Sequence, residues 1–418
     1  MSSVAIIGQG YVGLPLAREA IRAGLTVVGI DINPGIVAGL NEGRSHVDDL
    51  ADSDLAQMLQ AGYRVTSAFD VIAEADDVVV CVPTPLTDSA EPDLSPLRSA
   101  VQQVARHLRP GTLVVIESTT YPGTTDEVVR PLLEADGLIA GRDFNLAFSP
   151  ERIDPGNPIF GLSNTPKIVG GHTTACGDRA AMFYGKMVQE VVRVRGTREA
   201  EMAKLLENTY RHINIALVNE MVRFCRELGI DLWDAIDAAA TKPFGFQAFR
   251  PGPGVGGHCI PIDPNYLSHN VRTRLGYPFR FVELAQEVND SMPAYVGRRI
   301  QERLNADGIT MRGASVLLLG VTYKPDIADT RETPAAPLLR VLQDQGAQVS
   351  YHDPFVAEWA PRGEHVPAVA DLSTALADVD ICVMLQPHMV YDLPEISATA
   401  RRVLDTRGVM SGPAVERL

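Results

Sequence analysis

Residues 3–31 read SVAIIGQGYVGLPLAREAIRAGLTVVGID, and this stretch decides the fold at the start of the chain. One short apolar run ends at Gly8 and a second ends at Asp31. Between them, residues 11–24 carry apolar side chains at helical spacing and end on a glycine. Strand, glycine turn, helix and strand in this order predict the βαβ unit that opens a doubly wound α/β domain.

The glycines of this turn are spaced as a dinucleotide-binding loop requires. Gly8, Gly10 and Gly13 form GQGYVG directly after the first strand. The first glycine makes the tight turn, the second lets the backbone approach a pyrophosphate, and the third allows close packing of helix and strand. The free N–H groups of the helix N-terminus then face the phosphates. We therefore assign Gly8, Tyr11, Val12 and the other two glycines to a cofactor site.

Asp31 lies 18 residues after Gly13, at the end of the second strand. A carboxylate there accepts hydrogen bonds from an adenosine ribose and repels a 2'-phosphate, which favours NAD over NADP. The alternative interpretation is a structural Rossmann domain in which Asp31 is only solvated.

Further apolar runs show little polar alternation and are separated by helical stretches. They are DDVVVCVPTP (76–85), GTLVVIEST (111–119) and FNLAFSPE (144–151). Such runs predict a parallel sheet that is covered by helices on both faces.

The same alternation returns after Arg312. ASVLLLGVTY (314–323) predicts a strand, APLLRVLQDQGA (336–347) a helix, and QVSYHDP (348–354) a strand that ends in an acid. DVDICVMLQPH (378–388) resembles the earlier DDVVVCVPTP. We expect a second doubly wound domain, which lacks GxGxxG and should not bind a second dinucleotide in the same manner.

Between the two domains, residues 196–229 are helical in pattern without an obvious breaker. More than thirty residues is long for a globular helix. We expect this helix to join the domains and to pack against a partner subunit in a homodimer. The predicted fold class is α/β, with two Rossmann-like doubly wound domains joined by a long central helix. The predicted boundaries are 1–195, 196–300 and 301–418.

The composition excludes several classes of function. The net charge is -15 and the hydrophobic content is 45%, so the chain has ample core and no basic footprint for nucleic acid. The N-terminus has no signal-peptide pattern, and no apolar run is long enough to span a membrane. We expect a cytoplasmic protein that binds neither nucleic acid nor a membrane.

The cysteines are odd in number, far apart and without a CxxC pair, which disfavours both a disulfide framework and a zinc site. They are Cys81, Cys176, Cys225, Cys259 and Cys382. We expect reduced thiols and no metal site.

One cysteine has unusual surroundings. Cys259 lies in PGPGVGGHCIPIDP (251–264), a glycine- and proline-rich stretch that also contains Asp263. Such a loop is rigid and lets backbone approach a ligand, and a cysteine attacks only as a thiolate whose pKa its surroundings lower. The alternative is a buried packing thiol, which we expect of Cys81, Cys225 and Cys382.

Several ordered motifs carry a family resemblance over essentially the whole chain. They are GQGYVG, CVPTP (81–85), ESTTYPGTT (117–125), FSPERIDPGN (148–157), AEMAKLLENTYRHINIALVNE (200–220), PGPGVGGHCIPIDP and GVTYKPDIADTRETP (320–334). The chain resembles the UDP-glucose/GDP-mannose dehydrogenase family of nucleotide-sugar 6-dehydrogenases. The resemblance implies oxidation of the C6 alcohol of a UDP-sugar to a carboxylate with two NAD molecules, through a thiohemiacetal and a thioester on Cys259.

The resemblance also implies the catalytic residues. Asp263 matches an acid that orients water or takes a proton beside the thiol. Lys204 and Asn208, four apart on the long helix, match residues that stabilise the oxyanion. Thr119 matches a residue that helps to hold the water and contacts the cofactor, and Glu151 matches the base proposed for thioester hydrolysis.

The remaining site residues follow from the same motifs. Some family members carry a second glutamate where this chain has Pro155, so the hydrolytic base is Glu151 or Asp263. The resemblance assigns Pro83, Thr84 and Arg331 to the cofactor, and it assigns Glu151, Arg152, Lys204, Asn208, Arg250, Gly256 and Lys324 to the substrate. A solvated Arg250 is an equally good interpretation, and we interpret His258 as structural.

The motifs SPERIDPGN and GGHCIPIDPNYL resemble the branch that acts on UDP-N-acetylglucosamine or UDP-N-acetylmannosamine. UDP-glucose, or another nucleotide diphosphate on glucose, is the alternative substrate. Two other classes stay open: a two-electron relative of the hydroxyacid dehydrogenases, which needs no thiol, and a non-catalytic NAD-binding regulator.

Overall fold

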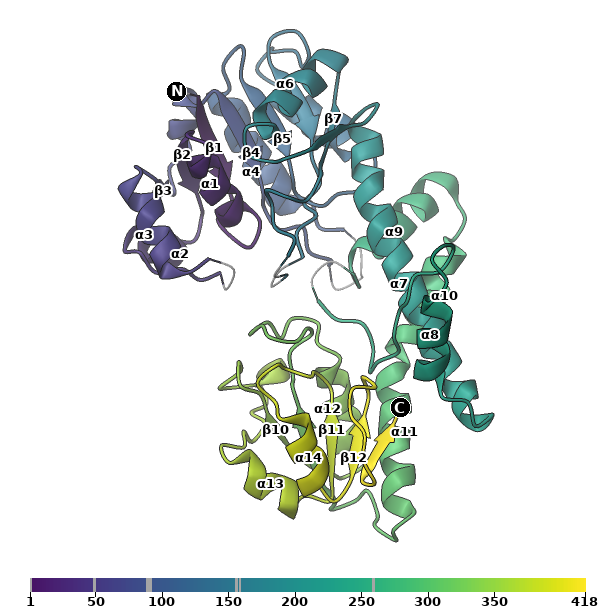
Figure 1. The fold of residues 1–418 in the computed structure, drawn as a ribbon. Coiled ribbons are helices and arrows are strands. Elements are labelled where there is room, and N and C mark those ends of the chain that lie inside the picture. Colours follow the sequence, from purple (N-terminus) through teal and green to yellow (C-terminus); the bar gives the residue numbers. More distant parts are fainter. Residues whose placement is uncertain (1, 48–49, 88–91, 155–156, 158, 258–259) are drawn as a thin grey trace. The chain divides into compact units, whose positions relative to one another are not determined.

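The computed structural model describes residues 2–47, 50–87, 92–154, 157, 159–257 and 260–418 (Figure 1). The chain forms two compact units. The first comprises Met1–Glu207 with Asn265–Gly276, and the second comprises Asn208–Pro264 with Tyr277–Leu418.

The first unit contains an eight-stranded sheet of order β3-β2-β1-β4-β5-β6-β7-β8. Its strands are β1 (Ser3–Ile7), β2 (Thr26–Ile30), β3 (Arg64–Thr66), β4 (Asp77–Val80), β5 (Leu113–Ile116), β6 (Asn145–Phe148), β7 (Lys167–Gly171) and β8 (Val191–Arg193). All neighbours are parallel except β6 and β7. The predicted strands β1, β2, β4, β5 and β6 pair in parallel, as expected, and β7 was not among the predicted strands. A parallel neighbour needs a crossover, usually a helix, and the described residues between β6 and β7 form none.

Helices cover this sheet as its apolar strands require. They are α1 (Gly13–Arg22), α2 (Pro34–Asn41), α3 (Asp52–Gln60), α4 (Ser95–His107), α5 (Arg130–Leu133), α6 (Thr174–Tyr184) and most of α9 (Asp263–Leu275). The apolar sides of α1 and α6 share one core cluster with Val4 and Ile6 of β1. Alternate residues of a strand point to opposite faces, so Ala5 and Ile7, which are also buried, belong to the other face.

The second unit contains a parallel five-stranded sheet of order β10-β9-β11-β12-β13. Its strands are β9 (Ser315–Leu319), β10 (Gln348–His352), β11 (Ile381–Met384), β12 (Val403–Asp405) and β13 (Val415–Arg417). Its helices are α8 (Leu232–Ala240), α10 (Arg280–Asp290), α11 (Met292–Asn305), α12 (Ala335–Asp344), α13 (Leu372–Asp378) and α14 (Leu393–Thr399).

The two faces of the second sheet carry different helices. Val316 and Leu318 of β9 pack in one core cluster with α11 and α12. Leu317 and Leu319 pack in another with α13 and α14. This sheet is therefore doubly wound, as the repeated apolar runs predicted.

Helix α7 (Thr197–Glu227) is 31 residues long and passes from the first unit into the second, which confirms the predicted joining helix. The fold class is confirmed as two Rossmann-like α/β parts with this helix connecting them. Across the described residues, we find no helix with the length and apolarity that crossing a membrane requires.

Candidate active site

The glycine turn after β1 has no room for side chains at its first and third glycines. Gly8 has φ 88°, and a Cβ there would lie 2.5 Å from the carbonyl oxygen of Cys81. A Cβ on Gly13 would lie 1.8 Å from the carbonyl oxygen of Gly8. A Cβ on Gly10 would meet no atom of the described residues within 4 Å, so backbone is open to a ligand there. These are the properties that a pyrophosphate loop needs.

Helix α1 and Asp31 complete this cradle. Tyr11 and Val12 lead into α1, and Val12 at its N-cap makes no side-chain cap hydrogen bond. The Asp31 carboxylate accepts hydrogen bonds from the backbone N–H of Gln9 (2.9 Å) and of Asn33 (2.9 Å). An open helix N-terminus beside an oriented carboxylate fits the phosphates and the adenosine ribose of NAD.

The ends of β4 and β5 meet at the predicted cofactor residues Thr84 and Thr119. The Thr84 hydroxyl donates to the carbonyl oxygen of Thr119 at 2.8 Å, and the Tyr266 hydroxyl donates to the carbonyl oxygen of Thr84. Pro83 is exposed beside them. Sequence reasoning missed Tyr266, which is fully buried and ties α9 to this edge of the sheet.

Glu151 lies beside a buried ionic cluster. Its side chain is 12% exposed, and its Oε2 is 3.5 Å from Lys167 Nζ, which is 3.1 Å from Glu117 Oε1. Burial raises the pKa of Glu117, while Lys167 opposes that rise. Burial works against the charge of Lys167, but Glu117 and Glu151 outweigh it and raise its pKa. The arrangement therefore holds a cation against the Glu151 carboxylate.

Helix α7 contacts the same segment through Lys204, whose Nζ donates to the carbonyl oxygen of Glu151 at 2.6 Å. The Arg152 guanidinium pairs with Glu207 at 2.7 Å and donates to the carbonyl oxygen of Pro166 at 2.6 Å. Lys204 and Glu151 are thus brought together, while Arg152 is engaged with α7.

One turn further along α7, the Asn208 amide donates to the Asp263 carboxylate. Asp263 begins α9 and is 2% exposed. His212, another turn along, is fully buried, and neither ring nitrogen has a hydrogen-bond partner among the described residues. Burial lowers the pKa of His212 to about 4, so its imidazole is neutral at pH 7. The predicted nucleophile Cys259, with His258 and Pro155, lies outside the described residues.

The start of the PGPGVGG stretch is held by two buried asparagines that sequence reasoning missed. Asn219 of α7 accepts a hydrogen bond from the backbone N–H of Gly252 at 2.9 Å and donates to Asn289 at 2.9 Å. A Cβ on Gly256 would lie 2.6 Å from the carbonyl oxygen of Glu332. The stretch therefore packs against the loop that carries Lys324 and Arg331.

The three predicted cations of the second unit differ in their surroundings. Lys324 is half-buried on the loop after β9. Arg331 is exposed and pairs with Asp329 at 2.6 Å on the same loop. Arg250 is exposed and pairs with Asp237.

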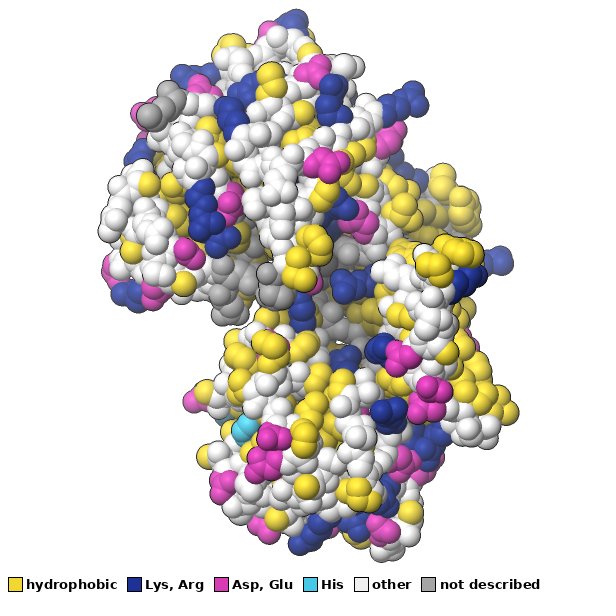
Figure 2. Space-filling model, viewed as in Figure 1, with side chains coloured by type: hydrophobic (Ala, Val, Ile, Leu, Met, Phe, Trp, Pro, Cys, Tyr) yellow, Lys and Arg dark blue, Asp and Glu magenta, His cyan; other side chains and the backbone are white. Residues whose placement is uncertain are grey.

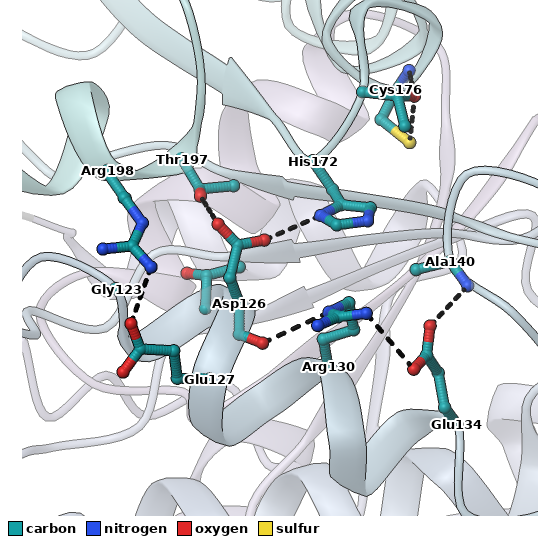
Figure 3. A network of polar contacts seen from close by, with 12 residues as sticks. Gly123, Asp126, Glu127, Arg130, Glu134, Ala140, His172, Cys176, Thr197 and Arg198 are labelled. Atoms are coloured by element: carbon teal, nitrogen blue, oxygen red, sulfur yellow. Dashed lines mark hydrogen bonds and ion pairs between the residues drawn. The ribbon is translucent and has the colours of Figure 1, made fainter.

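A polar network fixes the N-terminus of α7 in the first unit (Figure 3). Asp126 lies between His172, at 2.7 Å from its Nδ1, and Thr197, whose hydroxyl donates to it at 2.7 Å. Glu201 of α7 is fully buried and accepts hydrogen bonds from the backbone N–H groups of Gly123 (2.6 Å) and Thr125 (2.8 Å). These hydrogen bonds join the segment after β5, which includes Thr119, to helix α7, which carries Lys204.

Two of the missed residues left a signal in the sequence. Lys167 is a charged residue inside the apolar strand KIVGG, and Asn219 follows Asn208 by three helical turns. Glu201 left no signal, because an acid near a helix start is usually solvated. Within the described ranges, no three His, Cys, Asp or Glu side chains group as a metal site would need.

Comparison with known proteins agrees with this geometry. Three models of the UDP-glucose/GDP-mannose dehydrogenase family match the chain: the NAD binding domain at residues 2–188, the central domain at 198–291 and the UDP binding domain at 317–412. The glycine turn and Asp31 therefore lie in an NAD-binding domain, and the cofactor is NAD.

Curated relatives and solved structures are similar over most of the chain. UDP-N-acetyl-D-glucosamine 6-dehydrogenase of Pseudomonas aeruginosa is 37% identical over 85% of this chain and 83% of its own. UDP-N-acetyl-D-mannosamine dehydrogenase of Pyrococcus horikoshii is 33% identical over 99% and 97%. A solved UDP-D-ManNAc dehydrogenase from P. horikoshii matches with a TM-score of 0.90, 31% identity and coverage of 99% and 98%. A UDP-glucose dehydrogenase from Pyrobaculum islandicum matches with a TM-score of 0.87, 27% identity and coverage of 100% and 96%.

Proposed function

Because the chain belongs to the UDP-glucose/GDP-mannose dehydrogenase family, we propose that it oxidises the C6 alcohol of a UDP-N-acetylhexosamine to the carboxylate. Per sugar, the reaction consumes two NAD and one water and releases two NADH with protons. The observation that carries the proposal is the pairing along α7, where Lys204 contacts the backbone of Glu151 and Asn208 contacts Asp263.

Cys259 is the nucleophile of this scheme. NAD, when bound, accepts hydride from the sugar carbon in each of the two oxidations. The Cys259 thiolate adds to the aldehyde formed first and gives a thiohemiacetal, which prevents escape of the aldehyde. Oxidation of the thiohemiacetal leaves a thioester, and water releases the carboxylate and regenerates the thiol.

Lys204 and Asn208 stabilise the negative oxygen of each tetrahedral species. Their backbone positions on adjacent turns of one helix support this role, because a rigid helix fixes the spacing of the two donors. Asp263, which accepts a hydrogen bond from Asn208, exchanges the proton of the thiol or the water.

Glu151 activates the hydrolytic water, and Thr119 helps to hold it. The surroundings of Glu151 support this role, because the Lys167 ammonium lies 3.5 Å from its carboxylate. Its Oε1 accepts hydrogen bonds from the backbone N–H groups of Arg152 (2.8 Å) and Ile153 (2.6 Å), which orients the carboxylate.

The substrate is UDP-N-acetylglucosamine or UDP-N-acetylmannosamine. Both curated relatives described above carry such a sugar in their names, at 37% and 33% identity. UDP-glucose is the alternative, since a UDP-glucose dehydrogenase has the same fold at 27% identity. The free cysteines Cys81, Cys176, Cys225 and Cys382 fit a reducing compartment, and we place the reaction in the cytoplasm.

The active form is a homodimer built on α7. Its exposed apolar side chains recur at helical spacing within about 80° of the helix circumference; they are Met202, Leu206, Tyr210, Leu217 and Phe224. Figure 2 shows hydrophobic side chains gathered over α8 and α10, at the right of the view. Exposed apolar faces of this kind support association.

Leu217→Glu places a charge in this apolar face, so it should halve the mass measured by sedimentation. Glu220→Gln is the control, because it changes an exposed polar residue of the same helix, and it should not alter the mass.

A panel of UDP-N-acetylglucosamine, UDP-N-acetylmannosamine and UDP-glucose tests the function by counting NADH formed per sugar consumed. We expect two NADH per sugar, with the highest kcat/KM for an acetamido sugar. One NADH per sugar would contradict the scheme. Cys259→Ser should stop net turnover, whereas a two-electron hydroxyacid-type enzyme would barely respond to this change.

A further inference from the structure

The loop Val321–Asp326, which follows β9, is bonded to the segment that follows β11. The Gln386 amide donates to the carbonyl oxygen of Tyr323 at 2.7 Å, and the backbone N–H of Asp326 donates to His388 Nδ1 at 2.8 Å. The His388 side chain, which follows β11, therefore accepts a hydrogen bond from the main chain of the loop.

The hydrogen bonds of His388 define its protonation. Nδ1 accepts from an N–H group, so it carries no proton. Nε2 lies 3.1 Å from Asp353 Oδ2 and donates to it, and both side chains are fully buried. The imidazole is therefore neutral, with its proton on Nε2.

A second proton on His388 is incompatible with this loop geometry. It would place N–H against the N–H of Asp326, two donors facing each other. The Asp326 carboxylate lies 3.9 Å from Nδ1, which is beyond hydrogen-bond distance, and the backbone N–H of Met389 donates to it at 2.8 Å. Asp326 has φ 63°, a conformation that needs support from its surroundings.

This loop lies in the region of the chain that we expect to bind the nucleotide sugar. It carries Lys324, and its Tyr323 ring lies against the glycine-rich stretch, since a Cβ on Gly257 would be 2.8 Å from that ring. The loop belongs to the part of the chain that matches the UDP binding domain. A change in the conformation of this loop would therefore move both Lys324 and the Tyr323 ring that packs against the glycine-rich stretch.

We propose that His388 is a positioning residue for the UDP-sugar, which in its neutral form fixes the loop Val321–Asp326 and on protonation releases it. The inference rests on the proposed function, because it takes a UDP-sugar as the ligand of this loop. His388 is fully buried, so in this proposal it acts through the Asp326 backbone and not by contact with the substrate.

The groups that face His388 come from each neighbouring element. Asp353 and His352 lie at the end of β10, Asp326 lies on the loop, and the Tyr391 ring is 5.5 Å away on His388's own segment. Val321 N–H also donates to Asp353, at 2.7 Å, so this carboxylate is held in place for the imidazole. UDP-sugar affinity should fall as the pH falls, and NAD affinity, set in the other unit, should not follow it.

Titration calorimetry of the full chain with UDP-N-acetylglucosamine, in the absence of NAD, tests the proposal between pH 5.5 and pH 8. The diphosphate of this probe keeps its charge over the range. His388→Leu should weaken binding about tenfold at pH 8, the size of one lost hydrogen bond of about 1.4 kcal/mol. In His388→Asn the amide oxygen can replace Nδ1, so affinity at pH 8 should stay within about twofold of the wild type and should not change with pH.

His352→Asn is the matched control, a neighbouring histidine that does not bond to the loop, and it should keep the wild-type profile. A purely structural role of His388 would lower thermal stability in both variants and leave the pH profile unchanged. Wild-type affinity that is flat with pH overturns the inference, as does a His388→Asn profile equal to the wild type, even if His388→Leu does not fold. If the wild type binds no UDP-sugar, the proposed function fails as well; if it binds and the His388 variants match it, only this inference fails.

Discussion

Strand β1 in the first unit and strand β9 in the second are each followed by a left-handed glycine, and the next strand in each is followed directly by an aspartate. Gly8 has φ 88° and Gly320 has φ 77°. Asp31 and Asp353 each accept a hydrogen bond from the backbone N–H one residue after that glycine, at 2.9 and 2.7 Å. A Cβ on either glycine would lie 2.5 Å from a carbonyl oxygen of the neighbouring strand's end.

The two units differ in what fills the space beside the aspartate. Helix α1 begins at Gly13, whereas α12 begins only at Ala335, so a long loop follows the second turn. Asp31 is followed by Ile32, which is 80% exposed, while Asp353 is covered by the buried His388. In the first unit, a helix N-terminus and Asp31 are placed to bind a dinucleotide. In the second unit, the turn after the strand is the same, but the His388 side chain occupies the space beside Asp353. The fold alone therefore does not decide which turn binds NAD.

The largest effect is expected at the third glycine of the first turn. Gly13→Val would place a Cβ 1.8 Å from the carbonyl oxygen of Gly8, a backbone atom that cannot move aside. We expect loss of NAD binding in calorimetry and a destabilisation of the first unit by more than about 3 kcal/mol. Gly320→Val should destabilise the second unit and leave NAD binding intact.

Gly10→Ala is the matched control, because its Cβ meets no described atom within 4 Å. This variant should fold normally and bind NAD more weakly, since the methyl group occupies the space of the pyrophosphate. Unchanged NAD affinity in Gly10→Ala would place the pyrophosphate elsewhere.

The buried acids of the two units should give opposite pH dependence. Burial raises the pKa of Glu201 to about 7, although hydrogen bonds from Thr125 and Gly123 oppose the rise. Burial works against the charge of Asp353, but hydrogen bonds from His388 and from two backbone N–H groups outweigh it and lower its pKa. Glu201 stabilises the folded state below its unfolded pKa of 4.5, and that contribution, about 3 kcal/mol, is lost as the pH rises through 7. The contribution of Asp353 is present above its unfolded pKa and is lost only as the pH falls through its lowered value.

Scanning calorimetry from pH 5 to pH 8.5 should therefore show the transition of the first unit moving to lower temperature as the pH rises. In Glu201→Gln that slope should flatten, because the variant carries no proton to lose. A slope that survives in Glu201→Gln would assign the effect to another group.

Asp31→Asn tests the aspartate of the first turn. Removing the charge should weaken NAD binding about tenfold and reduce the preference for NAD over NADP, because the repulsion of a 2'-phosphate is lost. Asp353→Asn should leave both dinucleotide affinities unchanged. Equal effects of the two substitutions on NAD affinity would mean that the space beside the aspartate does not determine which turn binds NAD.

Local patterns predicted the first glycine turn, the long apolar strands and α7, because each depends on residues close in sequence. GQGYVG requires glycine at Gly8 and Gly13 for steric reasons that are visible in the sequence alone. The antiparallel β7 was not predictable, since pairing direction depends on the connection and not on strand composition. The same holds for Lys167 beside Glu151, for Asn219 beneath Gly252 and for His388 beneath Asp326, where residues 16, 33 and 62 positions apart come together.

The smallest expected effect concerns two helix caps, one in each unit. Asn33 accepts from the backbone N–H of Gly35 at 2.9 Å at the start of α2, and Asp392 accepts from that of Glu395 at 3.0 Å at the start of α14. Asn33→Ala and Asp392→Ala should each cost about 1 kcal/mol and lower only the calorimetric transition of the unit that contains the change, by a few degrees. If both variants shift one common transition by the same amount, the units unfold together, and the separate stabilities assumed for the two turns would have to be given up.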